Sequence, residues 1–220
     1  MIYVIMCGGY YQNFAETPKQ LCKVGGETLV DRTIRLLQEA GVTAICITSN
    51  DERFEGHGVP VLHHENTYRY DNGQLYGYWL DAFYPHFDPE QKVTFLFGDV
   101  LYTPAAIDAI VHCDRPGNIL FGSWLATNKL GANWGEPFAY VVNDYKTFME
   151  GVKAVKDLYD IGAVDRNPIV WELYRYLNGL EINRQAVLED TFIVIDDGTI
   201  DADDPERFEE WNRMYCTSRT

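Results

Sequence analysis

The chain has 220 residues, of which 46% are hydrophobic and 23% charged, a composition that excludes a disordered or fibrous chain. Its 18 basic and 33 acidic residues give a net charge of −15, which excludes broad nucleic-acid or anionic-membrane binding because both require a basic surface. No apolar run approaches the roughly 20 residues that span a bilayer, and the cysteines are dispersed without C-x-x-C spacing. We therefore expect a soluble, cytoplasmic protein with reduced thiols.

Strands and helices are predicted to alternate along the chain. The first strand is an apolar run at residues 2–6 that ends in Cys7-Gly8-Gly9, the form of a buried strand entering a glycine turn. An amphipathic helix is expected over residues 28–40 and is followed by Gly41. Further strands are expected at 42–48, 59–62, 93–97, 118–121, 138–142 and 192–195, and further helices at 74–84, 104–112, 144–158, 168–178 and 205–214.

This alternation predicts an α/β fold, in which a mostly parallel central sheet is covered by helices on both faces. The sequence shows no internal repeat, low-complexity tract or linker, so we expect a single domain over residues 1–220. Ligands of open α/β sheets bind outside the carboxyl ends of the strands. The loops that follow the predicted strands are therefore the first places to search for a site.

The loop after the first strand has features of a phosphate-binding loop. Gly8 and Gly9 permit close backbone approach, and consecutive amides there can hold a phosphate. Pro18 stiffens the approach to Lys19, whose ammonium is a suitable point charge. Taken alone, the glycine pair also fits an ordinary tight turn, and Lys19 a solvated surface lysine. An acidic chain that binds phosphates needs such a local device, or a metal ion.

Two acidic segments follow predicted strands. Asp99 stands at the tip of the strand at 93–97, and Asp201 and Asp203 lie in the segment before the last predicted helix. Carboxylate oxygens at such a position suit Mg²⁺, a hard cation that prefers oxygen ligands. The alternatives are a turn aspartate at Asp99 and an acidic N-cap before Pro205.

The segment Asn72-Gly73-Gln74 is a candidate for contact with a nucleobase. Gly73 permits close approach of a planar base, and Gln74 offers its edge both a donor and an acceptor. The alternative is a plain Asn-Gly turn that caps a helix. His63 and His64 are adjacent on a predicted strand and point in opposite directions, so they are not expected to share a metal.

In combination, these segments resemble the nucleotidyltransferase superfamily with the GT-A-like fold. Within it, the chain looks most like the small phosphocholine-type cytidylyltransferases and the sugar-phosphate nucleotidyltransferases. The opening signature L-A-G-G-x-G-x-R, then P-K, then p-L-i-d-r is matched by Met6-Cys7-Gly8-Gly9, Thr17-Pro18-Lys19 and Leu29-Val30-Asp31-Arg32. The segment from Asp201 to Phe208 resembles the late motif D-x-D-T-P-E-D-F, with Asp204 and Arg207 as departures. Tyr11 and Asn13 depart from the signature, because they replace its third glycine and its arginine.

The resemblance implies an enzyme that transfers a nucleoside monophosphate, with CMP favoured, to a small phosphorylated acceptor and releases pyrophosphate. It implies Mg²⁺ as the cofactor. The implied partners are a nucleoside triphosphate, with CTP favoured, and the acceptor, and neither nucleic acid nor a membrane is expected. A homodimer is left open. Residues 1–112 would form the nucleotide-binding half, and residues 113–220 the acceptor-binding half with the metal-binding acidic motif. The implied catalytic residues are Lys19, Asp99 and Asp203, and the implied metal ligands are Asp99, Asp203 and Asp201. The implied substrate contact is Glu136. The implied nucleotide contacts are Cys7, Gly8, Gly9, Tyr10, Tyr11, Asn13, Lys19, Asn72, Gly73, Gln74 and Asp99.

Two other classes of protein remain open from the sequence. A GT-A glycosyltransferase would bind a nucleotide sugar on the same fold, but Asp99-Val100-Leu101 lacks the second acid of an aspartate-any-aspartate motif. A nucleotide-binding or regulatory protein that has lost catalysis would account for the missing arginine at Asn13.

Overall fold

The computed structural model describes residues 1–8, 10–11, 16–123, 135–201 and 205–217. Its centre is a seven-stranded sheet with the order β13-β11-β12-β9-β1-β5-β6. β1, β5, β6 and β9 are parallel neighbours, while β12 runs antiparallel to both β9 and β11. The strand bounds are β1 (Ile2–Met6), β5 (Ile45–Thr48), β6 (Val61–Leu62), β9 (Val93–Phe97), β11 (Ile119–Gly122), β12 (Pro137–Val142) and β13 (Phe192–Val194).

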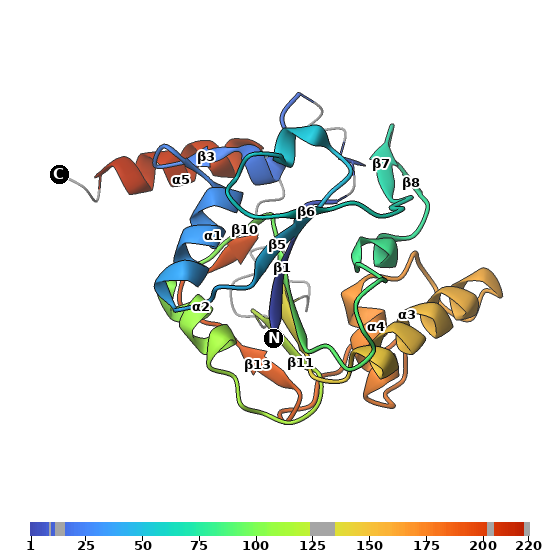
Figure 1. Cartoon of the computed structure of the whole chain (residues 1–220). Helices are drawn as coiled ribbons and strands as arrows, with labels where there is room; N and C mark the ends of the chain where they lie inside the picture. The colour runs from blue at the N-terminus through green and yellow to red at the C-terminus, as the bar shows by residue number, and fades with distance from the viewer. Residues whose placement is uncertain (9, 12–15, 124–134, 202–204, 218–220) are drawn as a thin grey trace.

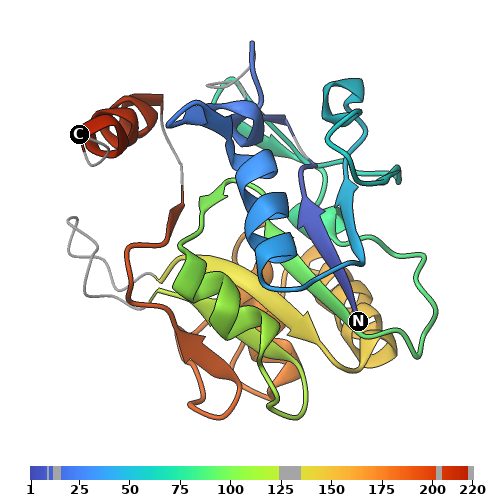
Figure 2. The same cartoon turned by 60° about the vertical axis from the view of Figure 1, so that its left-hand side comes forward.

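Helices cover both faces of this sheet. α1 (Leu29–Glu39) and α2 (Pro104–Val111) lie on one side, and α3 (Tyr145–Asp160) and α4 (Val170–Leu177) on the other (Figure 1). The turned view shows α1 and α2 side by side in front of the sheet (Figure 2). The predicted fold class, a mostly parallel sheet covered by helices in one domain, is confirmed.

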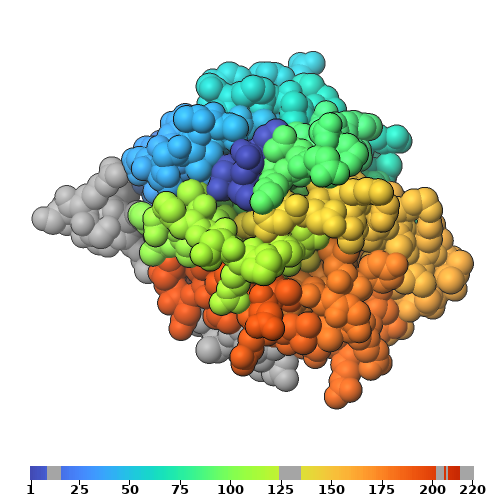
Figure 3. Space-filling model, turned by 60° about the horizontal axis from the view of Figure 1, so that its bottom comes forward, coloured from blue at the N-terminus to red at the C-terminus, as the bar shows by residue number. Residues whose placement is uncertain are grey.

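The local sequence accounts for these elements. β1, β5 and β9 are continuous apolar runs because they are buried on both faces of the sheet, as central parallel strands are. Thr28 caps α1 by accepting a hydrogen bond from the Asp31 amide, and Thr103 caps α2 in the same way from the Ala106 amide. The chain begins near the centre of the face shown in Figure 3. β1, β5 and β9 run in the same direction, so their carboxyl ends lie together at one edge of the sheet.

Short secondary elements are built around that carboxyl end. β3 (Lys23–Val24) and β4 (Glu27–Thr28) form a short antiparallel hairpin. β10 (Val100–Leu101) and β14 (Ile200–Asp201), which are far apart in sequence, form a second antiparallel pair. β2 (Tyr10–Tyr11) pairs in parallel with β7 (Arg69–Asp71), and the 3-10 helices are η2 (Lys19–Leu21), η3 (Glu52–Phe54) and η4 (Trp79–Ala82). α5 (Pro205–Thr217) lies beside β3 (Figure 1).

The helix predicted over residues 74–84 is wrong. The chain forms instead a hairpin of β7 and β8 (Gln74–Tyr76), followed by η4. Asn72 and Gly73 both have positive φ, 52° and 76°, which is the backbone of a two-residue type I′ turn. The Asn-Gly pair therefore reverses the chain between two strands, and it does not cap a helix.

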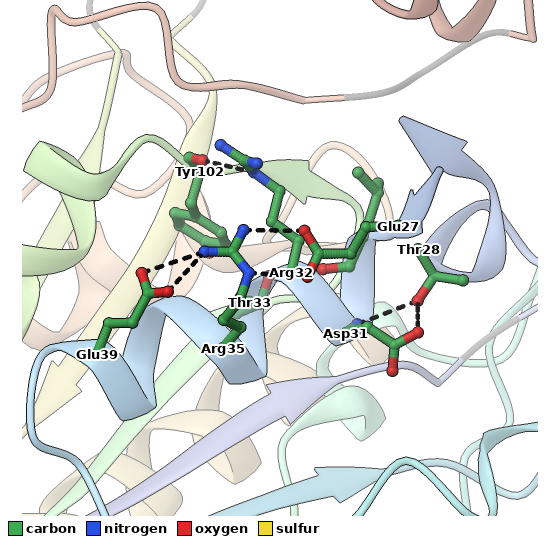
Figure 4. A network of polar contacts seen from close by, with 9 residues as sticks. Glu27, Thr28, Asp31, Arg32, Thr33, Arg35, Glu39 and Tyr102 are labelled. Carbon is green, nitrogen blue, oxygen red and sulfur yellow. Dashed lines mark hydrogen bonds and ion pairs between the residues drawn. The ribbon is translucent and has the colours of Figure 1, made fainter. Parts of the chain in front are cut away.

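A polar network ties α1 to its neighbours (Figure 4). Arg35 forms ion pairs with Glu27 on β4 and with Glu39 one turn further along α1. The Nε of Arg32 donates to the carbonyl of Tyr102 at 3.2 Å, which joins α1 to the chain after β10. Among the described residues, no helix is long and apolar enough to cross a membrane.

Candidate active site

Lys19 and Asp99 meet at the carboxyl ends of the central strands. Lys19 lies in η2, immediately after Pro18, and Asp99 follows β9 after Gly98. Their side chains form an ion pair and are largely buried, with 14% and 21% of their surfaces exposed. The pair joins the loop after β1 to the tip of β9.

Gly98 allows this close approach. Its amide donates to the Met6 carbonyl at 3.0 Å. A Cβ atom at residue 98 would lie 2.5 Å from that same carbonyl oxygen and 2.8 Å from the Sγ of Cys7. Only glycine fits there without displacing the backbone of β1, so the Gly-Asp pair after β9 has a steric explanation as well as a chemical one.

Asp201 lies next to Asp99 across a short antiparallel pair. The β10–β14 register places Asp201 opposite Val100, the residue that follows Asp99. Burial raises the pKa of Tyr102 well above its usual range, and the negative charges of Asp99 and Asp201 both add to the increase. Two of the three predicted metal ligands thus act on the same buried hydroxyl, whereas Asp203 lies outside the described residues.

α5 packs against the turn between β3 and β4. The side chain of Asn212 accepts from the Gly25 amide at 2.8 Å and donates to the Lys23 carbonyl at 2.7 Å. Phe208 and Trp211 on the same helix pack in a small cluster with Val24, Leu29 and Leu101. The helix is therefore fixed to the β3–β4 pair, to the start of α1 and to β10.

A cavity of about 490 Å³ opens beside this pair, at the carboxyl ends of β1 and β5. It is lined by Cys7, Gly8, Ser49, Asn50, Asp51, His64, Asn66, Thr67, Tyr68 and Arg69. Cys7 belongs to both regions, because it lines the cavity and because the charge of Asp99 adds to the effect of burial in raising the pKa of its thiol. The cavity and the Lys19–Asp99 pair are therefore two parts of one site.

Two polar atoms on the cavity wall are buried and have no hydrogen-bond partner among the described residues. One is the Nδ2 of Asn66, whose Oδ1 accepts from the Tyr68 amide at 3.1 Å and so fixes the amide orientation. The other is the Nδ1 of His64, whose Nε2 lies 2.7 Å from the carbonyl of Asp81 and must therefore donate to it. Burial lowers the pKa of His64, so its ring is neutral at pH 7 and Nδ1 is an acceptor. The wall thus contains one buried donor and one buried acceptor that the described residues leave unsatisfied.

The predicted site residues divide into three groups. Lys19, Asp99, Cys7 and Gly8 lie together at the site, and Tyr10 and Tyr11 form β2 beside it. Gly9, Asn13 and Asp203 lie outside the described residues. Asn72, Gly73 and Gln74 are exposed at the turn between β7 and β8, and they are not among the described residues that line the cavity.

Glu136 lies directly before β12, where its backbone bonds with Ser123 and closes the base of the β11–β12 pair. His63 is exposed and His64 is buried, so the two rings do point apart as predicted. Sequence reasoning missed Asn50 and His64 as cavity residues, whereas Asn66 and Arg69 stand in the segment that leads to the candidate base contact at Asn72-Gly73-Gln74. The available signal for the two missed residues was their position after β5 and β6, at the same sheet edge as Gly8.

Comparison with known proteins places the chain in a family. Residues 3–156 match the family model of the MobA-like NTP transferase domain. A search of curated protein sequences finds no significant match.

Solved structures match along the whole chain, at low sequence identity. A UDP-glucose pyrophosphorylase in its apo form has a TM-score of 0.64 and 11% identity, over 100% of both chains. A putative glucose-1-phosphate thymidylyltransferase from Bacillus anthracis has a TM-score of 0.59 and 15% identity, over 98% of this chain and 95% of that one. The CTP:phosphocholine cytidylyltransferase from Streptococcus pneumoniae has a TM-score of 0.58 and 15% identity, over 97% and 98%. At these identities the likeness establishes the fold.

Proposed function

Because the chain belongs to the MobA-like NTP transferase family, we propose that it transfers a nucleoside monophosphate from a nucleoside triphosphate to a small phosphorylated acceptor. An oxygen of the acceptor phosphate forms a bond to the α-phosphorus, the bond from the α-phosphorus to the bridging oxygen breaks, and pyrophosphate leaves with that electron pair. The observation that carries the proposal is the meeting of Lys19 and Asp99 beside the cavity at the carboxyl ends of β1 and β9.

In this proposal the cavity holds the nucleoside and Lys19 binds its phosphates. Small side-chain movements would bring the buried donor of Asn66 and the buried acceptor of His64 into contact with the nucleoside, and Gly8 allows the ligand to approach the backbone. Lys19 and the loop amides hold the α-phosphorus in line with the acceptor oxygen. A phosphate nucleophile is already ionised at neutral pH, so the reaction needs no general base.

The thiol of Cys7 and the hydroxyl of Tyr102 are excluded as nucleophile or base in this scheme. Burial raises the pKa of both groups, and the charge of Asp99 adds to each increase. Both therefore remain protonated at neutral pH. Their role is to pack the end of β9 against β1 and β12.

The described residues contain no group of three or more His, Cys, Asp or Glu side chains placed to hold a metal ion, and we propose that Asp99 and Asp201 hold Mg²⁺ together with a ligand from outside them. Asp99 and Asp201 supply carboxylate oxygens at the mouth of a phosphate site, the donor set with which Mg²⁺ is held beside substrate phosphates. We include Asp203 as a third ligand on the strength of the sequence motif. When bound, the metal would neutralise charge that develops on the phosphoryl oxygens.

CTP is the favoured nucleotide and a sugar phosphate or phosphocholine-like headgroup the favoured acceptor, with Glu136 and residues 113–220 forming the acceptor side. The proteins with similar structures include a CTP:phosphocholine cytidylyltransferase and a putative glucose-1-phosphate thymidylyltransferase, which sets this range of acceptors.

Cys7, Cys22, Cys46 and Cys113 are free thiols, which is in keeping with a cytoplasmic location. The family match favours nucleotidyl transfer over the use of a nucleotide sugar.

The experiment is a matrix of the four ribonucleoside triphosphates and dTTP against phosphocholine and a set of sugar 1-phosphates. Pyrophosphate release is measured with Mg²⁺ and with EDTA, and Asp99→Asn serves as the inactive control. We expect release that requires one triphosphate, one acceptor and the metal together. Absence of release in every cell of the matrix, from protein that is folded, would contradict the proposal.

A further inference from the structure

Arg69 is the single lysine or arginine among the described residues that line the cavity. Asp51 is the single aspartate or glutamate there, and it is already paired with Arg53 at 2.5 Å. Arg69 therefore gives the wall of this cavity an uncompensated positive charge, in a chain whose net charge is −15.

Several other cations of the chain are engaged in ion pairs. Arg35, Lys156 and Arg175 all form ion pairs, with Glu27, Asp81 and Glu172 respectively. Arg69 forms no ion pair with any described residue, although acidic side chains outnumber basic ones 33 to 18. An unpaired cation on the wall of a nucleotide site suits the anionic part of the nucleotide, which is its phosphate chain.

The β7–β8 hairpin holds Arg69 in place without using its hydrogen-bond donors. Arg69 and Tyr76 are direct partners in the register of the two strands. The guanidinium carbon lies 4.8 Å from the centre of the Tyr76 ring, within the range of a cation–π contact. Stacking on a ring face leaves the N–H groups in the guanidinium plane available to a ligand, and these groups suit phosphate oxygens.

The register of a second pair sets Arg69 beside the loop that follows β1. β2 and β7 are parallel, and Tyr10 is the direct partner of Arg69. Arg69 is therefore adjacent to the segment between Gly8 and Lys19, to which the proposed function assigns the phosphates.

We propose that Arg69 binds the triphosphate chain of the nucleotide, and so supplies a positive charge that Asn13 in the loop lacks. The proposal rests on the proposed function, since it assigns a role within the same site. Two other cations are placed less well for it. Arg32 is directed to the carbonyl of Tyr102 (Figure 4), and Lys23 lies exposed on β3, where α5 packs.

The test uses inorganic tripolyphosphate, which has no base, together with CTP and cytidine. Binding is measured by calorimetry with Mg²⁺ for wild type, Arg69→Ala and Arg69→Lys. Lys146→Ala is the matched control, because it removes the same charge from an exposed position on α3. Arg69 is itself exposed, so its replacement should leave the unfolding temperature unchanged.

We expect Arg69→Ala to weaken tripolyphosphate and CTP binding by about 10- to 100-fold, the range for a charge-assisted contact, and to leave cytidine binding unchanged. Arg69→Lys should recover part of the loss, and Lys146→Ala should behave like wild type. Equal weakening of CTP and cytidine would show that Arg69 contacts the base and overturn the inference, as would unaltered tripolyphosphate binding or no binding by wild type.

The outcome is separable from that of the proposed function. A loss of tripolyphosphate binding in Arg69→Ala, in a protein that releases no pyrophosphate with any acceptor, would support the phosphate contact and contradict the catalytic proposal. Normal turnover and an unchanged KM for the triphosphate in Arg69→Ala would support the catalytic proposal and contradict the phosphate contact of Arg69.

Discussion

Replacement of Lys19 by alanine should damage catalysis far more than folding. The Lys19 and Asp99 side chains are only 14% and 21% exposed, so their ion pair is less screened than one on the open surface. Its loss should lower the free energy of unfolding by about 1 kcal/mol, since water can still reach the Asp99 carboxylate. A charge-assisted contact with a phosphate contributes roughly 1.5–3 kcal/mol, so kcat/KM should fall by about 10- to 150-fold.

The assay combines pyrophosphate release with urea unfolding of the same preparations. Lys23→Ala is the matched control, because Lys23 is exposed and its loss changes the net charge equally. A cycle with Asp99→Asn adds a further check: the effects of the two changes on stability should not be additive, because the residues form a pair. If Lys19→Ala and Lys23→Ala have the same kcat/KM, the assignment of Lys19 to the phosphates is refuted.

Four further predictions concern single residues. Asp201→Asn should raise the Mg²⁺ concentration for half-maximal turnover by about 10-fold or more, and an unchanged metal titration would remove it from the ligands. Tyr102→Phe should lower the free energy of unfolding in urea by about 1–2 kcal/mol, because the buried Phe138 carbonyl loses its donor. A loss below about 0.5 kcal/mol, which is typical of a surface substitution, would contradict this. Burial lowers the pKa of His64 below its usual 6.5, so the stability from its neutral ring is complete above that pH and is lost as the pH falls toward the lowered pKa. His64→Gln should therefore lose less stability than wild type between pH 7 and 5. Parallel plots of unfolding free energy against pH for the two proteins would contradict this role of His64. Asn13→Arg should tighten triphosphate binding at low salt and less so at physiological ionic strength, where the Debye length is about 8 Å; no change at low salt would mean that residue 13 does not face the phosphates.

Most of the fold could be predicted because its elements carry strong local signals. The apolar runs of β1 and β9 mark buried strands, and Thr103-Pro104 marks the start of α2, where the structure begins that helix. The antiparallel direction of β12 could not be predicted in this way. Strand direction depends on the path of the chain between strands, and a buried run such as residues 138–142 has the same pattern in either direction.

The error at residues 74–84 has a physical cause. Aromatic residues at Tyr76 and Trp79 suit both a strand and a helix, and spacing over so short a segment does not separate the two. The Asn72-Gly73 pair was the better signal, because both residues tolerate the positive φ that a hairpin turn requires. The hairpin matters for the site, since it carries Arg69.

The chemical core of the site could be predicted and its walls could not. Lys19 and Asp99 each follow a strand, so the rule that ligands bind at the carboxyl ends was enough to bring them together. His64 and Asn66 have no motif of their own. In each side chain one polar atom has a partner, because His64 Nε2 bonds to the Asp81 carbonyl and Asn66 Oδ1 bonds to the Tyr68 amide. The other polar atom of each has none among the described residues, and only the three-dimensional contacts reveal this.

The most direct test of the central claim follows an oxygen label through the reaction. The acceptor, with ¹⁸O in its phosphate, is incubated with the triphosphate, Mg²⁺ and enzyme, and the products are analysed by mass spectrometry and ³¹P NMR. Attack of the acceptor phosphate on the α-phosphorus predicts a diphosphate-linked product that retains all of the label, with ¹⁸O in the bridge, and unlabelled pyrophosphate. Labelled inorganic phosphate, or a nucleoside monophosphate released without the acceptor, would contradict nucleotidyl transfer at this site.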